Sequence, residues 1–280
     1  MAEAISTATT RITAPLTILA GPTPLVMPTG GCERPNAMRI AAADNEASLT
    51  DRDWSPWGRP EKGWETYEPL ITQEIGSACG PESPGFAEAL ARWQVAHKLP
   101  GDGVMSAQTF EALRVLWLRR RPFVQAFSAG VCPPDADEAA LVATDKAEAY
   151  SGKPVQLQAA ALSAYRAMLA AAREDVFEVG ANRQLLTIFS GYRAPSDDEA
   201  RCDRDGGCGT LIRARCSAHR TGTAVDLNLG AAPASRPDST EDFNRRFQSR
   251  TPAYRWMVAN AGRFGFTPYP FEPWHWEWAG

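Results

Sequence analysis

The sequence predicts an α+β fold, because helical and strand-like segments mix along the chain without a repeating strand–helix unit. Residues 85–117 and 155–173 carry apolar side chains at intervals of three and four residues, the period of amphipathic helices. Residues 223–230 (TAVDLNLG) and 274–278 (WHWEW) alternate from one residue to the next, the period of strands. The two periods predict helices in the middle of the chain and strands in its last third.

Composition and charge narrow the class of partner. Of the 280 residues, 44% are hydrophobic and 22% charged, which is enough for one large or two smaller cores. The formal net charge of −4 gives no general reason for binding nucleic acid or an anionic membrane. We therefore expect a protein without a nucleic-acid partner. The basic run at residues 119–121 is expected to close a helix, where cations suit the C-terminus.

The first 60 residues are rich in Ala, Thr, Pro and Gly and show no sustained period, so we expect a flexible leader over 1–60. Residues 12–32 are uncharged, but prolines interrupt their apolar run. This segment predicts at most a degenerate export signal, and no transmembrane helix. The letters TGGC, ending at Cys32, resemble a lipoprotein cleavage site, which leaves a lipoprotein anchored through Cys32 as an alternative.

Residues 61–121 are expected to form a small helical domain, with order beginning near Trp64. Residues 100–103 break the periodic stretch into two helices, and Ser106 can cap the second one. His97 follows Trp93 by one helical turn and has no acidic or cysteine neighbour at ligand spacing, so we expect it to be packed. The apolar faces are formed by Phe86, Leu90, Trp93 and His97 on the first helix and by Phe110, Leu113 and Trp117 on the second.

This stretch resembles the peptidoglycan-binding type 1 domain, whose last two helices carry the pattern F-Q-x-x-x-x-L followed by D-G-x-x-G-x-x-T-x-x-x-L. The matching residues are Trp93, Gln94, Leu99, Asp102, Gly103, Thr109 and Leu113, while Ser106 replaces the second glycine. The resemblance implies a three-helix module that binds the cell wall, with its first helix within 64–75. The alternative is a plain helical hairpin packed on the rest of the protein.

Six cysteines lack the close-paired spacing of a zinc ribbon, so disulfides and an oxidising compartment are expected. Cys79 and Cys132 bracket one segment and could join its ends. A further disulfide is expected within the cluster of Cys202, Cys208 and Cys216. This pattern predicts an exported protein.

A connector over 122–155 leads to a second domain over 156–280, whose elements follow from local patterns. Residues 185–193 (LLTIFSGYR) predict a strand that enters a glycine turn. In the next strand, Val225, Leu227 and Leu229 share one face and Asp226 lies on the other, beside small Ala224. Thr251 and Pro252 read as the cap and first position of a helix.

Two of only three histidines lie near these strands, at His219 and His275. Gly222 lets the backbone fold back between His219 and Asp226, so these two side chains could converge. His275, from the last strand, would complete the three-ligand set of a catalytic zinc, with a fourth position open to water. The sequence therefore predicts a zinc ion held by these three residues.

A general base and a positive group are expected beside the metal. Glu272 precedes Pro273, and Glu-Pro-Trp-His reads as a turn that would bring the Glu272 carboxylate near the metal. Glu277 is the rival base, because strand alternation points it to the same side as His275. Arg193, just past the glycine turn, could face the negative charge that develops on a carbonyl oxygen under attack.

These motifs resemble the zinc D-alanyl-D-alanine carboxypeptidases of the VanY and VanX type. The segment SAHRTGTAVD (217–226) fits the signature S-x-H-x-x-G-x-A-x-D, and EPWH and SGYR fit two others in the family's order. The resemblance implies that zinc is bound by His219, Asp226 and His275, and that Glu272 is the base. It also implies that Arg193 stabilises the transition state, that Ser217 helps to hold substrate, and that a small antiparallel sheet with flanking helices forms the domain. The segment after Arg193 lacks the glutamine often found there.

The function expected from this resemblance is removal of the terminal D-Ala from peptidoglycan stem peptides by a zinc-dependent carboxypeptidase. The enzyme would be exported to the periplasm or cell wall and act as a monomer. The alternatives are an endopeptidase that cuts within the stem or cross-bridge, and a wall-binding protein whose zinc domain is inactive. Glu272 and Arg193 argue against the inactive protein, because a pure binder needs neither.

Overall fold

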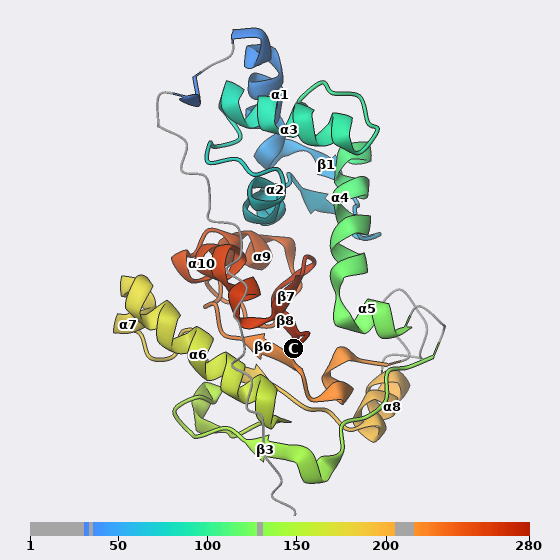
Figure 1. The fold of residues 1–280 in the computed structure, drawn as a ribbon, viewed down its shortest axis with the longest axis vertical. Coiled ribbons are helices and arrows are strands. Elements are labelled where there is room, and N and C mark those ends of the chain that lie inside the picture. The colour runs from blue at the N-terminus through green and yellow to red at the C-terminus, as the bar shows by residue number, and fades with distance from the viewer. Residues whose placement is uncertain (1–30, 34–35, 128–130, 205–215) are drawn as a thin grey trace, which may run out of the picture.

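The computed structural model describes residues 31–33, 36–127, 131–204 and 216–280. Figure 1 shows a helical lobe at one end, a lobe with a small sheet at the other, and helix α4 running from the first towards the second. The helical lobe contains α1 (Arg39–Asp51), β1 (Asp53–Trp54), β2 (Glu61–Lys62), α2 (Glu68–Glu74), α3 (Pro84–Ala96) and α4 (Ala107–Arg120). Helix α5 (Pro122–Phe127) follows at the sheet.

The sheet lobe is α+β, as predicted. Its central sheet has the strand order β5-β6-β8-β7, and every neighbouring pair is antiparallel. A separate two-stranded ladder pairs β3 with β4. The elements are β3 (Leu141–Ala143), β4 (Gln156–Gln158), α6 (Ala159–Asp175), α7 (Phe177–Ala181), β5 (Ile188–Ser190), α8 (Pro195–Arg204), β6 (Ala224–Leu227), α9 (Asp242–Ser249), α10 (Pro252–Asn260), β7 (Phe266–Tyr269) and β8 (Glu272–Trp278).

The two helices predicted for the helical lobe form, and the second begins at the predicted cap, Ser106. Ser83 and Ser106 accept hydrogen bonds from the backbone N–H groups three residues ahead, at the starts of α3 and α4. The predicted apolar faces are buried, except at His97. The ring of His97 stacks on that of Trp93, with centroids 3.9 Å apart, but the residue is exposed, so only one side of it is packed.

The residues that match the wall-binding pattern hold this lobe together. The buried amide of Gln94 donates hydrogen bonds to Asp102 Oδ1 (2.9 Å) and Thr109 Oγ1 (3.0 Å) and accepts one from Gly103 N (2.8 Å). Asn45 of α1 spans the same loop, accepting from Met105 N at 2.7 Å. The pattern therefore has a structural role in joining α3 to α4, and wall binding stays a prediction.

The prediction of a flexible leader over 1–60 is wrong for residues 36–60. Helix α1 covers 39–51, and its Ala41 and Ala42 pack against Ala87 of α3. Small alanines make a close helix contact without the strong apolar period by which a helix is found in sequence, which is why α1 was missed. The part of this prediction that concerns residues 1–30 lies outside the described residues.

Disulfides form, but not with the predicted partners. Cys32 is bonded to Cys79, and Cys132 to Cys216. The suggested Cys79–Cys132 link and a bond for Cys216 within its own cluster are therefore wrong, because spacing along the chain does not reveal which cysteines meet in space. Cys208 and the side chain of Cys202 lie outside the described residues. The bond to Cys79 also leaves Cys32 no thiol for a lipid, which argues against the lipoprotein alternative.

Buried and exposed polar contacts join the two lobes, in addition to a shared apolar core. Arg245 of α9 is buried and contacts Glu61 Oε1 (3.0 Å) and the Tyr67 hydroxyl (2.9 Å), both in the helical lobe. Arg250, which is more exposed, pairs with Glu65. Part of the predicted connector also belongs to the sheet lobe, since β3 lies within residues 122–155 and pairs with β4.

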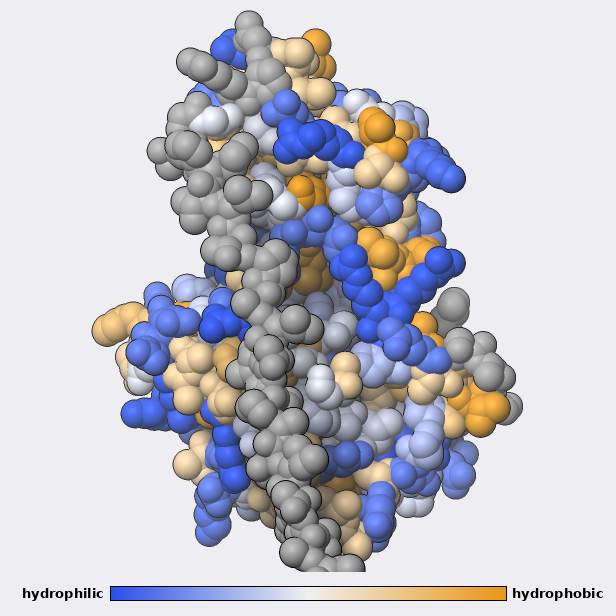
Figure 2. All heavy atoms as spheres, viewed as in Figure 1, coloured by the Kyte–Doolittle hydropathy of each residue, from blue (hydrophilic) through white to orange (hydrophobic). Residues whose placement is uncertain are grey.

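The surface carries scattered apolar residues. Figure 2 shows them on one face as small separate groups among hydrophilic side chains. Within the described ranges, no helix is long and apolar enough to cross a membrane.

Candidate metal centre

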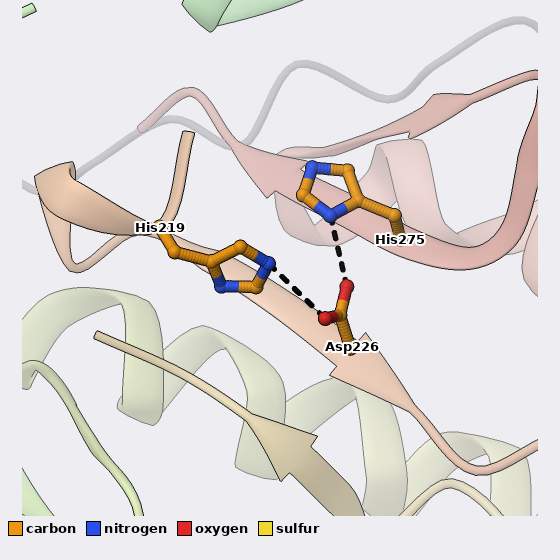
Figure 3. A group of neighbouring side chains, drawn as sticks. All are labelled: His219, Asp226 and His275. Carbon is orange, nitrogen blue, oxygen red and sulfur yellow. Dashed lines mark hydrogen bonds and ion pairs between the residues drawn. The ribbon is translucent and has the colours of Figure 1, made fainter. Parts of the chain in front are cut away.

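His219, Asp226 and His275 converge as predicted. Each offers one ligand atom, and these three atoms lie within 4.8 Å of one another. All three residues are buried. Figure 3 shows the His219 ring reaching from the turn before β6 and the His275 ring from β8, both directed at the carboxylate of Asp226 on β6. Among the described residues, this is the one group of at least three His, Cys, Asp or Glu side chains so arranged.

A short 3₁₀ helix, Ala218–Thr221, positions His219. The Ser217 hydroxyl caps this helix by accepting a hydrogen bond from His219 N, and Gly222 ends it in the left-handed region, at φ +69°. A Cβ at Gly222 would lie 2.9 Å from Leu141 Cδ2. The positive φ favours glycine at this position, and a Cβ would also require the Leu141 side chain to shift, so the chain reverses into β6 at the predicted point.

Strand pairing places Asp226 and His275 opposite each other. In the antiparallel ladder of β6 and β8, Asp226 is the partner of His275. Directly opposed residues on one face of such a ladder have neighbouring side chains. The alternation read from the sequence is therefore confirmed on both strands.

The hydrogen bonds of the rings orient one nitrogen of each histidine towards Asp226. His219 Nε2 lies 3.1 Å from Asp226 Oδ2, and its Nδ1 lies 2.7 Å from the carbonyl oxygen of Gly191. His275 Nδ1 lies 2.9 Å from Asp226 Oδ1. A ring that donates its second nitrogen to a carbonyl or carboxylate is typical of a metal-binding histidine, because this bond fixes the tautomer and the ring plane.

Burial and charge shift the pKa values of the three groups apart. Burial lowers the pKa of His219. Burial also opposes ionisation of Asp226, but the two histidines outweigh it and hold the pKa of that carboxyl well below its usual range. For His275, burial favours the neutral ring, whereas the Asp226 and Glu277 carboxylates raise the pKa to about 9. The carboxylates on either side therefore favour the protonated form of the His275 ring.

Glu272 begins β8, so the separate turn predicted over 272–275 is not formed. Instead the ladder shifts: Tyr269 pairs with Glu272 and Pro268 with Trp276, and the Trp276 indole N–H donates to Pro273 O at 3.0 Å. The irregularity in the ladder still leaves the Glu272 carboxyl near the two other residues, as the predicted turn would have done, since the charges of His275 and Asp226 both act on it. Burial raises the pKa of Glu272, as suits a general base near neutral pH.

Arg193 and Ser217 lie together beside the histidines. Arg193 Nη1 donates to Ser217 Oγ and its Nη2 to Ser190 Oγ, both at 3.2 Å, while its backbone N–H donates to His219 O. Asp198 of α8, which the sequence analysis missed, lies 3.7 Å from Arg193 Nη1 and accepts from Ser217 N. Asp198 lies in the segment after Arg193 that lacks the glutamine often found in the family. That departure is the sequence signal that could have pointed to it.

Arg121 is the second residue that the sequence analysis missed. It was grouped with the basic residues of a helix end, but α4 ends at Arg120, and the Arg121 side chain turns inward to the Glu277 carboxylate. Burial opposes ionisation of Glu277, but His275 and Arg121 lower its pKa to about 2. Glu277 is therefore an anion that already has partners, which makes it a poor general base.

The C-terminal segment that carries His219, Asp226 and His275 is similar to a known family. Residues 210–280 match the family model of VanY, D-alanyl-D-alanine carboxypeptidase. This VanY segment contains His219, Asp226, Glu272 and His275, whereas Arg193 and the helical lobe precede it.

A solved structure of a VanY protein is also similar, over part of the chain. It is a mutant of vancomycin resistance D,D-pentapeptidase VanY from a VanB-type resistance cassette, in complex with Zn(II). The sequence identity is 20% and the TM-score 0.30, over 52% of this chain and 83% of that chain. A TM-score this low supports no transfer of function. No curated protein matches the chain.

Proposed function

We propose that this protein is a zinc-dependent peptidase that acts on peptidoglycan stem peptides. The observation that carries the proposal is the convergence of His219, Asp226 and His275 within a segment that matches VanY. The two disulfides and the substrate both point to an exported enzyme, in the periplasm or cell wall.

The donor set fits zinc. Two imidazoles and one carboxylate are a common set for a catalytic zinc, with one position left for water or substrate. His219 would bind through Nε2, because Gly191 O occupies its Nδ1, and His275 through Nδ1. When bound, zinc polarises the scissile carbonyl and lowers the pKa of water at the site.

The remaining residues supply proton transfer and charge. Glu272, with its pKa raised, would accept a proton from the attacking water and deliver it to the leaving amine. Arg193, fixed by Ser190 and Ser217, would face the negative charge that develops on the carbonyl oxygen. Ser217 would help to hold substrate indirectly, because its hydroxyl accepts a hydrogen bond from Arg193 and caps the short helix that carries His219.

Removal of the terminal D-Ala, as by a D-alanyl-D-alanine carboxypeptidase, is the reaction that we propose. One observation favours endopeptidase action as a second candidate. A carboxypeptidase has to bind the free carboxylate at the end of its substrate, but Asp198, 3.7 Å from Arg193, partly neutralises the positive charge of that arginine. The helical lobe would serve as the wall-binding module, on the strength of its sequence pattern.

Mass analysis of purified muropeptides tests the proposal. The zinc-loaded protein should remove one alanine from pentapeptide stems, and Glu272→Gln protein loaded with the same zinc should not. Split cross-links would identify the endopeptidase instead. Unchanged muropeptides with the zinc-loaded protein would overturn the proposed function.

A further inference from the structure

The end of α4 sends one arginine into the sheet lobe. Arg121 Nε donates to Glu277 Oε1 at 2.7 Å, and its Nη2 contacts the same oxygen. The other oxygen, Glu277 Oε2, accepts from Phe123 N at 2.8 Å, at the start of α5. The Arg121 side chain is 10% exposed and that of Glu277 2%, so the pair is shielded from water. Arg120, the residue before Arg121, pairs instead with Glu74, and its side chain is 52% exposed.

The Glu277 carboxylate lies directly behind one of the proposed zinc ligands. Its Oε1 is 3.4 Å from His275 Nε2, and Asp226 occupies the other nitrogen, Nδ1. The His275 ring is therefore flanked by a carboxylate at each nitrogen. Nδ1 faces the candidate metal site, and Glu277 is the ion-pair partner at Nε2, which makes no hydrogen bond among the described residues. This contact restrains the ring from its outer side.

A second contact fixes the arginine. Its guanidinium carbon lies 3.9 Å from the centre of the Tyr269 ring, and the Tyr269 ring packs edge to face against His275, with centroids 6.0 Å apart. A planar guanidinium stacked on an aromatic ring and bonded to a carboxylate has little freedom. Arg121 therefore holds both groups that contact the outer side of His275.

We propose that Arg121, contributed by the helical lobe, is a positioning residue for the metal site, acting on His275 through Glu277. The inference rests on the proposed function in that it takes His275 as a zinc ligand. Without Arg121, the Glu277 carboxylate loses its buried counter-charge and its fixed position, and the imidazole loses the partner that orients it. The helical lobe is thus part of the zinc site as well as a candidate wall-binding module.

Zinc affinity of the full-length chain tests this inference, measured by competition with a chromophoric chelator. Arg121→Met keeps much of the side-chain volume and removes the charge, and it should weaken zinc binding by about 10- to 100-fold, as loss of an outer partner typically does. Arg121→Lys keeps the charge but not the planar fork, so it should fall between Arg121→Met and the wild type. Arg120→Met, one residue away, is the matched control and should bind zinc within about twofold of the wild type.

A double-variant cycle separates positioning from general stability. In a Glu277→Gln background, Arg121→Met should cause little further loss of zinc affinity, because the contact through which it acts is already gone. Equal affinity of Arg121→Met and wild type would overturn the inference, as would a full loss that persists in the Glu277→Gln background. If Arg121→Met does not fold, the same comparisons are made with Arg121→Lys. A wild-type chain that binds no zinc would instead refute the proposed function.

Discussion

Replacing Arg245 by methionine should destabilise the protein by about 3–5 kcal/mol, the usual cost of removing one partner from a buried ion pair. The side chains of Arg245 and Glu61 are 2% and 1% exposed. Arg245 also donates to the Tyr67 hydroxyl, which in turn donates to Glu61 Oε2 at 2.6 Å. The substitution thus leaves a buried carboxylate between the lobes without its counter-charge.

The deficit should depend on pH. Burial raises the pKa of Glu61 even with Arg245 present, and removal of the arginine raises it further. A carboxyl whose folded pKa is raised stabilises the fold below its unfolded pKa, about 4.3, and loses that contribution as pH rises through the folded value. The Arg245→Met deficit should therefore be largest at about pH 8 and shrink towards about pH 5.

Urea unfolding followed by tryptophan fluorescence measures this effect. Arg250→Met is the matched control, because Arg250 joins the same lobes through Glu65 but its side chain is 58% exposed. An exposed pair contributes at most about 1 kcal/mol. An Arg245→Met deficit no larger than that of Arg250→Met, or one independent of pH, would refute the reasoning.

Three further outcomes are expected. Glu272→Gln should retain zinc and lose at least about 100-fold in turnover, whereas Glu277→Gln at saturating zinc should lose much less; the reverse order in a kinetic assay would place the base at Glu277. Zinc added to the metal-free protein at about pH 7 should release about one proton, because the pKa of His275 is raised to about 9; calorimetry in buffers of different ionisation enthalpy would contradict this if it showed no release. Unreduced, denatured protein should expose at most two of its six thiols, and more than two would exclude the observed disulfides.

The convergence of His219, Asp226 and His275 could be predicted because it depends on local geometry. Gly222 permits the reversal before β6, and strict alternation along β6 and β8 puts Asp226 and His275 on facing positions. The caps of α4 and α10 were also readable, since each depends on one hydroxyl that accepts a hydrogen bond from the backbone N–H three residues later.

Contacts between distant segments could not be predicted in the same way. Arg121 and Glu277 are separated by 156 positions, and a basic run at a helix end gives no sign that one member turns inward. The pairing of Cys132 with Cys216 likewise depends on how the connector lies against the sheet lobe. Helix α1 was missed for another reason, because its buried face is made of alanines and one asparagine.

The central claim is that His219, Asp226 and His275 form one zinc site. Metal analysis of the purified protein by mass spectrometry, for wild type and a His219→Ala, His275→Ala double variant, tests it most directly. The wild type should contain about one zinc per chain and the double variant almost none, with both folded by circular dichroism. Full zinc content in a folded double variant would contradict the account.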